Sequence, residues 1–370
     1  MKFSCNQQIL SKSLNTISKA VSSRVTIPIL KGILLQTTGD GQVKMAASDL
    51  DISIEKKLPV SIYREGAVVV SAKLFTDIIR KLPNEEVEIE IDDNFNVAIR
   101  CLTSEFVIVG QPIEEFPQIG LIKEDEGIVI KKEIIKEMIK KTAFCASIEK
   151  ARGIIVGVLT EMEEDSLTMV ALDGFRMAVS RENTKNKENR KIVIDARIIN
   201  EIYKILAEEE EEEDINLIID DKKAVFLFGE TRIVSKLLEG EFIKYNEIIP
   251  KEYKCRLTVN RAELLDSVER ASLMAREGRN NLIKLSIETD KTIITSRSEE
   301  GNVREEVFIK NEGENLEIGF NAKYISDVLK AVGDEEIVME FNTAVSPCMI
   351  KPTEGDKYEY LILPVRLSSN

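Results

Sequence analysis

The sequence contains no histidine and no tryptophan, and only 5% of its 370 residues are aromatic. Without histidine, the chain lacks the commonest general base and metal ligand, and no Ser-His or Cys-His nucleophile pair can form. It also lacks a Walker A run, a Gly-Xaa-Gly-Xaa-Xaa-Gly turn after a strand and a His-Glu-Xaa-Xaa-His motif. Carboxylates are plentiful, but their order singles out no catalytic pair. We therefore predict a protein that is not an enzyme and uses no cofactor or metal.

Cysteines and long apolar runs are also scarce. The five cysteines are far apart, with no Cys-Xaa-Xaa-Cys pair, and are expected to be buried reduced thiols; they are Cys5, Cys101, Cys145, Cys255 and Cys348. No uncharged run is long enough to predict a membrane span, and the first residues lack the apolar core of a signal peptide. We expect a cytoplasmic protein with no membrane partner.

One segment is present three times, at residues 69–80, 193–204 and 319–330. In each, a strand ends at a capping residue, followed by Ala, a base, two apolar residues and an acid, which is typical of the start of an amphipathic helix. The capping residues Ser71, Asp195 and Asn321 lie 124 and 126 residues apart, about one third of the chain. The spacing predicts three copies of one domain.

A second helix repeats with the same spacing. Apolar residues recur at helical intervals in residues 5–22, and Leu10 and Ile134 are again 124 residues apart. Alternating β-branched runs lie between and after the helices, among them 43–55 and 167–181, each expected as one run. We predict an α+β fold of three domains, each with two helices packed on antiparallel sheets. The predicted domains are residues 1–120, 127–250 and 254–370.

Charge is unevenly distributed between the predicted helices and the rest of the chain. The six helical stretches contain 16 Lys and Arg and 9 Asp and Glu, a net charge of +7. Because the whole chain carries −14, the remainder carries −21. A basic helical side suits a polyanion such as nucleic acid. The alternative is that Lys and Arg are simply good helix formers.

Six motifs, in order along this repeat, are similar to those of one family. They are Met1-Lys2-Phe3, residues 24–30, 173–179, 235–242 and 320–324, and the end Leu363-Pro364-Val365-Arg366-Leu367. With them the chain resembles the bacterial sliding clamp, the beta subunit of DNA polymerase III. The resemblance implies a head-to-tail homodimer, a ring of six domains whose helices line a hole around double-stranded DNA. Scattered bases would then give weak, sequence-independent attraction that permits sliding.

The resemblance also assigns DNA contacts, by position, to Arg24, Lys73 and Arg152, with Lys150 as a substitute nearby. Better-known members have a glutamine and two aromatics where this chain has Glu149, Gly153 and Ile154. The alternative for these bases is an ordinary solvated side chain.

A peptide-binding groove between the second and third domains is the other implied surface. Most of its residues are apolar, which suits a short hydrophobic motif of a polymerase catalytic subunit, a clamp loader or another partner. Leu172, Phe175, Ile243 and Glu247 stand where Thr, His, Pro and Arg are common, so an altered peptide preference is expected. The implied groove residues are Ile155, Leu172, Gly174, Phe175, Arg176, Met177, Ile243, Glu247, Ile248, Val345, Pro347, Leu361, Leu363, Pro364, Val365, Arg366 and Leu367.

Two segments near this groove have a structural explanation that needs no bound peptide. Asp173-Gly174 between alternating strands is also the usual sequence of a hairpin turn. The chain continues beyond Leu367 with residues 368–370, which either cover part of the groove or fray.

The dimer interface is expected where the first domain of one chain meets the third domain of the other. By position, Phe106 and Ile108 should face Leu273 and Met274, flanked by charges such as Arg100 and Glu299 or Glu300. The alternative is that the apolar residues fill the cores of their own domains.

Two other function classes compete with the clamp. An acidic repeat scaffold would bind peptides but not DNA. A nuclease would need carboxylates clustered around magnesium, and the sequence has no such cluster on one element.

Overall fold

The computed structural model describes residues 1–21, 27–120, 127–185, 189–209, 213–278 and 280–367. The chain divides into two compact units. Unit 1 comprises Met1–Lys132 and Lys204–Leu237, and unit 2 comprises Glu133–Tyr203 and Leu238–Asn370. Both units contain part of the predicted central domain, and the three-domain boundaries stay a prediction.

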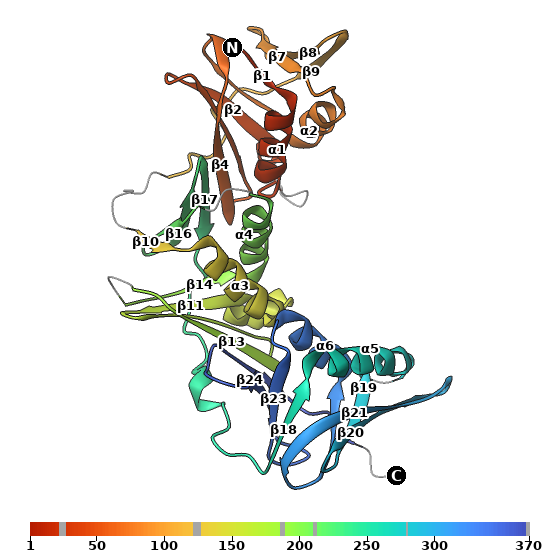
Figure 1. The fold of residues 1–370 in the computed structure, drawn as a ribbon. Helices are drawn as coiled ribbons and strands as arrows, with labels where there is room; N and C mark the ends of the chain where they lie inside the picture. Colours follow the sequence, from red (N-terminus) through yellow and green to blue (C-terminus); the bar gives the residue numbers. More distant parts are fainter. Residues whose placement is uncertain (22–26, 121–126, 186–188, 210–212, 279, 368–370) are drawn as a thin grey trace. The chain divides into compact units, whose positions relative to one another are not determined.

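Unit 1 contains two antiparallel sheets (Figure 1). The first has the order β5 (Ser61–Arg64), β1 (Lys2–Asn6), β7 (Glu86–Ile91), β8 (Asn96–Cys101) and β9 (Ser104–Val109). The second has the order β10 (Ile128–Ile130), β15 (Ile215–Ile219), β16 (Lys223–Phe228), β17 (Thr231–Lys236), β4 (Ile52–Pro59), β3 (Gln42–Ser48), β2 (Gly32–Thr38) and β6 (Ala67–Ser71). Because β17 pairs with β4, the second sheet runs unbroken from the first predicted domain into the second.

Unit 2 contains one long sheet that joins the second and third predicted domains in the same way, through the pairing of β13 with β25. Continuous sheets satisfy strand edges that separate domains would leave open. The strand order is β14 (Arg190–Asp195), β11 (Gly157–Glu163), β12 (Ser166–Leu172), β13 (Arg176–Asn183), β25 (Tyr358–Ile362), β24 (Cys348–Pro352), β23 (Glu336–Phe341), β18 (Cys255–Asn260), β21 (Gly301–Gly313), β20 (Lys291–Ser298), β19 (Leu282–Ile287) and β22 (Leu316–Asn321).

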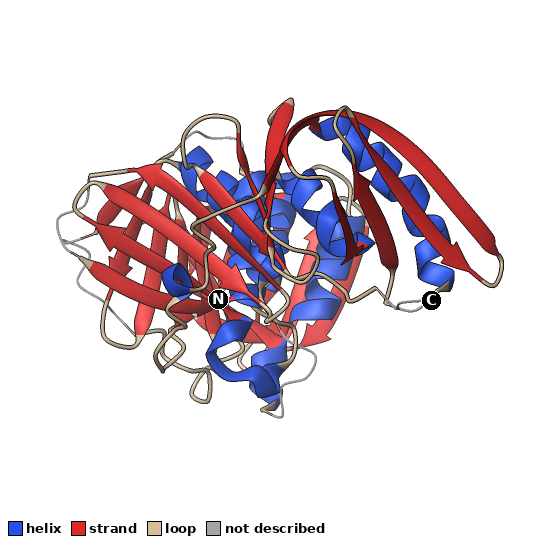
Figure 2. Ribbon diagram, turned by 90° about the horizontal axis from the view of Figure 1, so that it is seen from below, coloured by secondary structure: helices blue, strands red, loops and turns tan. Residues whose placement is uncertain are grey.

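Helices lie against these broad sheets (Figure 2). In unit 1, α1 packs on α2 and on β4, and in unit 2, α5 packs on α6 and on β20 and β21. Their apolar faces form the cores, as with Leu10, Leu14 and Ile17 of α1, which are fully buried. The helices are α1 (Gln7–Ser18), α2 (Ala72–Lys81), α3 (Lys132–Thr142), α4 (Ala196–Glu208), α5 (Arg261–Glu277) and α6 (Ala322–Ala331). The predicted α+β fold of helices on antiparallel sheets is confirmed.

The repeated helices begin where the sequence predicts. The side chains of Asp195 and Asn321 accept hydrogen bonds from the amides of Arg197 and Lys323, at 2.7 and 2.9 Å. Ser71 precedes α2, but its hydroxyl makes no capping hydrogen bond. That part of the prediction is wrong, and the first turn of α2 lacks the side-chain cap of the other two.

One run that the sequence predicts as continuous is a hairpin instead, and a second run contains the turn that Asp173-Gly174 allowed. In the first, β3 and β4 are separated by a turn in which Leu50 has φ of 76° and the Asp49 carboxylate accepts the amides of Asp51 and Ile52. In the second, the turn lies at 173–175, between β12 and β13. Side-chain alternation continues on both sides of each turn, so the pattern alone does not show the break.

All five cysteines are buried and free, as predicted. Burial raises the pKa of the Cys5 thiol to about 12 and that of Cys255 to about 11, so neither forms a reactive thiolate at neutral pH. Among the described residues, no helix combines the length and the apolar character needed to cross a bilayer.

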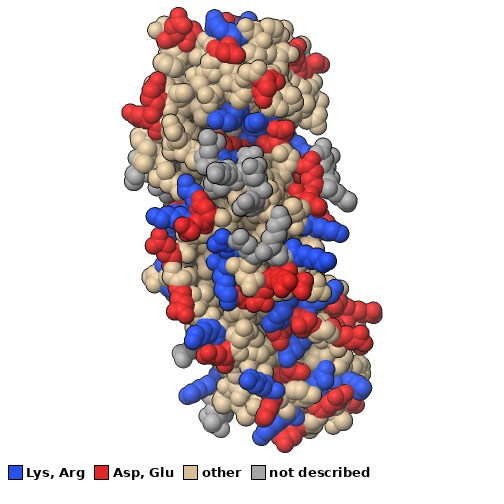
Figure 3. Space-filling view, turned by 90° about the vertical axis from the view of Figure 1, so that its left-hand side faces the viewer, with Lys and Arg blue, Asp and Glu red and all other residues tan. Residues whose placement is uncertain are grey.

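The net charge of the helices is positive, as the sequence predicts. The helices, as the structure bounds them, contain 15 Lys and Arg and 10 Asp and Glu, a net charge of +5, smaller than predicted because the observed helices are shorter or shifted. The face shown in Figure 3 carries bases and acids interspersed. The positive excess is therefore a property of the helices.

Candidate peptide, DNA and dimer surfaces

A tight turn between β12 and β13 is the centre of the candidate peptide surface. The Oδ1 atom of Asp173 accepts hydrogen bonds from the amides of Phe175 and Arg176, at 2.8 and 3.0 Å. Gly174 has φ of +89°, which a residue with a side chain rarely adopts. Asp173-Gly174 is therefore the hairpin turn that the sequence allowed, and the same turn presents Phe175.

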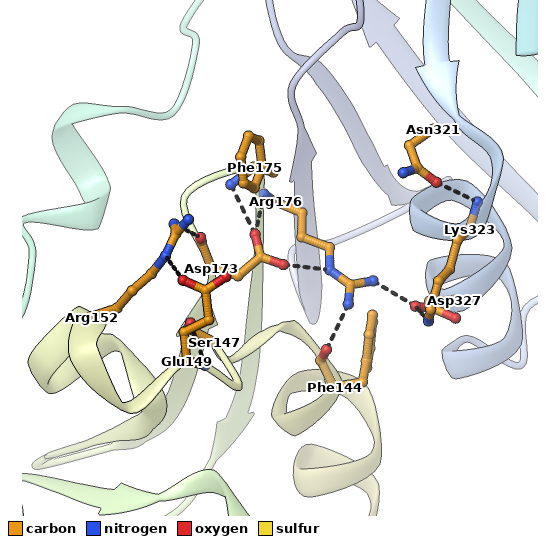
Figure 4. Close-up of polar contacts among 10 residues, drawn as sticks. All are labelled: Phe144, Ser147, Glu149, Arg152, Asp173, Phe175, Arg176, Asn321, Lys323 and Asp327. Carbon is orange, nitrogen blue, oxygen red and sulfur yellow. Dashed lines mark hydrogen bonds and ion pairs between the residues drawn. The ribbon is translucent and has the colours of Figure 1, made fainter. Parts of the chain in front are cut away.

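Arg176 holds this turn from beneath (Figure 4). Its guanidinium donates to Oδ2 of Asp173 at 3.1 Å, to Oδ2 of Asp327 on α6 at 2.7 Å and to the carbonyl of Phe144 at 2.9 Å. It also lies 4.6 Å from the ring centroid of Tyr324. The residue is only 8% exposed. The structure thus places Arg176 under the predicted groove surface, as a tie between the turn and α6.

Arg152 lies on the outer side of the same turn. Its Nη1 donates to the carbonyl of Asp173 at 2.8 Å, and its Nε donates to the Glu149 carboxylate at 3.0 Å. The guanidinium carbon lies 5.6 Å from the ring centroid of Phe175, whose ring is stacked at 6.4 Å on that of Tyr324. A predicted DNA contact and a predicted groove residue therefore touch.

These residues border a hollow of about 690 Å³ in unit 2. Its lining combines the aromatic rings of Phe144, Phe175 and Tyr324 with the bases Lys140 and Lys323. Tyr324 and Phe144 were not predicted as site residues. For Tyr324 a signal was available, because it ends the family-like motif at 320–324 and lies within the repeated segment 319–330.

The apolar floor of the candidate groove is one buried cluster. Leu172, Met177 and Leu361 belong to it, and Ile155 packs against it. The cluster also contains Met349 and Tyr245, and the latter donates a 2.6 Å hydrogen bond to the Glu161 carboxylate. Burial and this hydrogen bond raise the pKa of Tyr245. The structure brings together groove residues from three distant parts of the chain, and adds Met349 and Tyr245, which sequence reasoning missed.

Large apolar side chains are exposed around this floor. Val345 is 68% exposed and Leu363 38%, and the amide of Leu363 donates to the carbonyl of Phe175 at 2.8 Å. The other predicted groove residues are exposed or half-buried: Phe175, Ile243, Glu247, Ile248 and Arg366 are exposed, and Pro347, Pro364, Val365 and Leu367 are half-buried. Exposed apolar side chains around a buried apolar floor are typical of a surface that binds a hydrophobic partner.

A second hollow, of about 550 Å³, continues from this floor. It is lined by Leu159 and Val193 of the buried cluster and by residues 240–247. Ile243 and Glu247 lie on its border. Both differ from the common family residues, so this end of the groove is where an altered peptide preference is expected.

The predicted DNA contacts are spread over the chain. Arg24 and residues 368–370 lie outside the described residues. Lys73, at the start of α2 in unit 1, and Lys150, in unit 2, are exposed. Among the described residues neither makes an ion pair, whereas Arg152 is engaged by Glu149. Lys73 and Lys150 are thus free to meet a phosphate.

The predicted dimer residues lie on an edge strand, β9, and on helix α5, which packs on β21. Strand β9 ends the first sheet of unit 1, with Phe106 exposed and Ile108 only 8% exposed. In unit 2, residues 301–308 of β21 pair with β20 on one side, and on the other side they pair with no strand of the described chain. Leu273 on α5 is 58% exposed and Met274 is half-buried. Ile108 follows the alternative to an interface role, because its buried side chain belongs to the core of its own unit.

The flanking charge Arg100 is already satisfied within its own chain. It pairs with Glu88, Glu90 and Glu105 at 3.1, 3.0 and 2.8 Å. Glu299 and Glu300 are exposed. These contacts use Nε and Nη1 of Arg100, which leaves its Nη2 as the donor for an acid across an interface.

Comparison with known proteins covers the whole chain. Family models for the N-terminal, central and C-terminal domains of the DNA polymerase III beta subunit match residues 1–120, 129–244 and 246–366. A beta sliding clamp of Halalkalibacterium halodurans is 36% identical over 99% of this chain and 100% of its own length. One from Staphylococcus epidermidis is 33% identical over 99% of each chain.

Solved structures agree with these relatives. The DNA polymerase sliding clamp of Bacillus subtilis superposes with a TM-score of 0.95 at 35% identity, covering all of both chains. The DNA polymerase III beta subunit of Thermotoga maritima superposes at 0.92 with 29% identity, over 99% of this chain and 100% of that one. All three parts of the chain match, at full length and in fold, so the chain belongs to the DNA polymerase III beta subunit family, the beta sliding clamps.

Proposed function

We propose that two copies of this chain close into a ring that encircles duplex DNA and tethers the replicative polymerase during DNA replication. The observation that carries the proposal is the match to sliding clamps, which covers at least 99% of this chain and of each relative compared. The ring itself would hold DNA by topology. It would perform no chemistry, and it would act where bacterial DNA lies, in the cytoplasm.

Ring closure is supported by the two open strand edges. Strand β9 in unit 1 and residues 301–308 of β21 in unit 2 each have one side that pairs with no strand of the described chain. Exposed edges of this kind are templates for pairing with another chain. Phe106 on strand β9 and Leu273 on helix α5, which packs on β21, would supply the apolar contact. Two such heterologous contacts in one dimer would cover both of these edges.

DNA passage is supported by the positive excess of the helices. Lys73 and Lys150 carry free ammonium groups, which would attract phosphates without reading bases. A few weak contacts of this type let the ring slide, while tight contacts would hold it in place.

Partner binding is supported by the exposed apolar residues around the buried cluster. A hydrophobic segment of the polymerase catalytic subunit or of a clamp loader would bind there, and the ring would then keep that enzyme at a high effective concentration near the primer end. Glu247 at the border of the second hollow adds a preference for peptides with a base beside the apolar residues.

Light scattering of the purified chain over a dilution series tests ring closure. We expect twice 41.7 kDa at every concentration of the series. A stable monomer would remove the topological hold on DNA, and a peptide-binding scaffold would then be the better account.

A further inference from the structure

The first hollow, of about 690 Å³ and beside the turn at 173–175, carries more positive than negative charge. Five bases and three acids line it: Lys140, Arg152, Arg176, Lys323 and Lys330, against Glu149, Asp173 and Asp327. All three acids are engaged by bases of the same lining, Glu149 by Arg152 and the other two by Arg176 (Figure 4). The hollow therefore offers cations to a ligand and keeps its own carboxylates occupied.

Among the described residues that line this hollow, Lys140 is the base without an ion pair. It lies in the last turn of α3 and is exposed. Lys323 and Lys330 reach the hollow from α6, and they pair with Asp327 at 2.6 Å and with Glu269 at 2.7 Å. Both lysine side chains are more than half exposed, so these pairs are weak and a carboxylate of a ligand can replace them.

Aromatic rings form much of the remaining lining. The rings of Phe175 and Tyr324 are stacked with their centroids 6.4 Å apart, and Phe144 contributes a third ring. The Tyr324 hydroxyl makes no hydrogen bond with any described residue, and partial burial raises its pKa, so it stays a neutral donor. Ile148, which also borders the hollow, is almost fully exposed. Apolar surface beside cations and a free hydroxyl fits an acidic side chain with apolar neighbours.

A peptide fits this hollow better than a strand of nucleic acid. The hollow adjoins the candidate groove, because Phe175 lines it and the carbonyl of Phe175 accepts the amide of Leu363. A nucleic acid strand carries a phosphate on every nucleotide, and the three carboxylates of the lining would repel such a polyanion. A single acidic side chain needs only the cations.

We propose that the first hollow is a subsite for an acidic residue of the partner peptide, and that Lys140 reads the charge of that residue. The inference rests on the proposed binding of a hydrophobic peptide by this chain. The peptide carboxylate would accept a hydrogen bond from the Lys140 ammonium, with the Tyr324 hydroxyl as a second donor in the same lining. Apolar side chains of the peptide would pack on Phe175, and Lys323 and Lys330 would add to the positive field. Partners would thus be distinguished by an acid in addition to their apolar residues.

Fluorescence anisotropy with labelled peptides tests this subsite on the full-length protein. Each peptide carries two leucines and one phenylalanine, with two glutamates, two glutamines or two lysines placed either directly before or directly after them. At one of these two ends we expect the glutamate version to bind about fivefold more tightly than the glutamine version, the upper range for one partly exposed ion pair. At that end the lysine version should bind more weakly than the glutamine version, and high salt should remove the difference.

Variants of Lys140 separate the reading of charge from folding. Lys140→Gln should lower the preference for glutamate to less than about twofold, because the bases that remain are paired. Lys140→Glu should reverse the preference, so that the lysine version binds best. Lys136→Gln is the matched control and should keep the preference, because Lys136 lies one turn earlier on α3, pairs with Glu133 and does not line the hollow. Circular dichroism checks that each variant folds.

Equal binding of the glutamate and glutamine versions at both ends would overturn the proposal, and so would a preference that Lys140→Gln leaves unchanged. A nucleic acid site is the competing outcome. It would be indicated by a single-stranded oligonucleotide that displaces the peptides from the unmodified chain but not from Lys140→Gln, with no preference for glutamate. If the peptides bind regardless of their charge, the subsite fails alone. If none of them binds, the proposed peptide-binding function fails as well.

Discussion

Replacing Arg176 by alanine should lower the free energy of unfolding of unit 2 by about 2–3 kcal/mol. The loss should be greatest at the peptide surface, where Arg176 ties the turn at 173–175 to α6. Removing one partner of a buried ion pair typically costs about 3–5 kcal/mol, because a buried charge is left uncompensated. Here the cost is lower for two reasons. Asp327 keeps an ion pair with Lys323 at 2.6 Å, and Asp173 keeps the turn amides as donors. Both carboxylates are also partly solvated, with exposed fractions of 22% and 16%.

Urea denaturation followed by circular dichroism, for Arg176→Ala, Asp327→Ala and the double variant, isolates the contact. We expect the double variant to lose less stability than the two single variants together, by about 1–2 kcal/mol, as residues in direct contact do. Lys323→Ala is the control, since Lys323 binds the same carboxylate but is 63% exposed, and it should cost less than about 1 kcal/mol. Strict additivity of Arg176→Ala and Asp327→Ala would refute the argument that this tie holds the turn to α6.

Three further predictions concern the charges and edges of the molecule. Burial opposes ionisation of Glu209, but ion pairs with Lys56 and Lys12 outweigh burial and lower the pKa of its carboxyl below 4.5. The stability that these ion pairs contribute is complete above pH 4.5 and disappears as pH falls through the lowered pKa. Glu209→Gln should therefore be less stable than the unmodified chain near neutral pH, and it should lose less stability in an acid titration. Phe106→Glu should shift light-scattering mass from dimer to monomer upon dilution, and a mass that stays at the dimer value would exclude Phe106 from the interface. Lys73→Glu should weaken duplex binding and reduce the slope of log affinity against log salt by about 1, while an unchanged slope would remove Lys73 from the DNA surface.

The repeated elements were predictable because their signals are local. Helices α2, α4 and α6 each begin directly after the predicted capping residue, since the pattern of cap, alanine and apolar pairs lies within a few residues. The hairpin turn at Leu50 was missed, because alternation continues through it and nothing in the local sequence requires a positive φ.

The sequence predicted many residues of the candidate site, but not how these residues contact one another. Arg176 and Asp327 are 151 residues apart, and their pairing depends on the joining of β13 to β25, which no local pattern specifies. The sequence therefore placed Arg176 on the groove surface, while the structure buries it. Ile108 shows the same limit, since alternation along β9 does not reveal which face the unit covers.

Retention on DNA circles tests the central claim most directly. The purified chain is loaded by a clamp loader on nicked circular DNA and passed through a sizing column at high salt, before and after the circle is cut once. A closed ring predicts that the chain remains with the circle and is released when the DNA is linear, because topology is insensitive to salt. Release from the circle at high salt, or equal retention on cut and uncut DNA, would contradict encirclement.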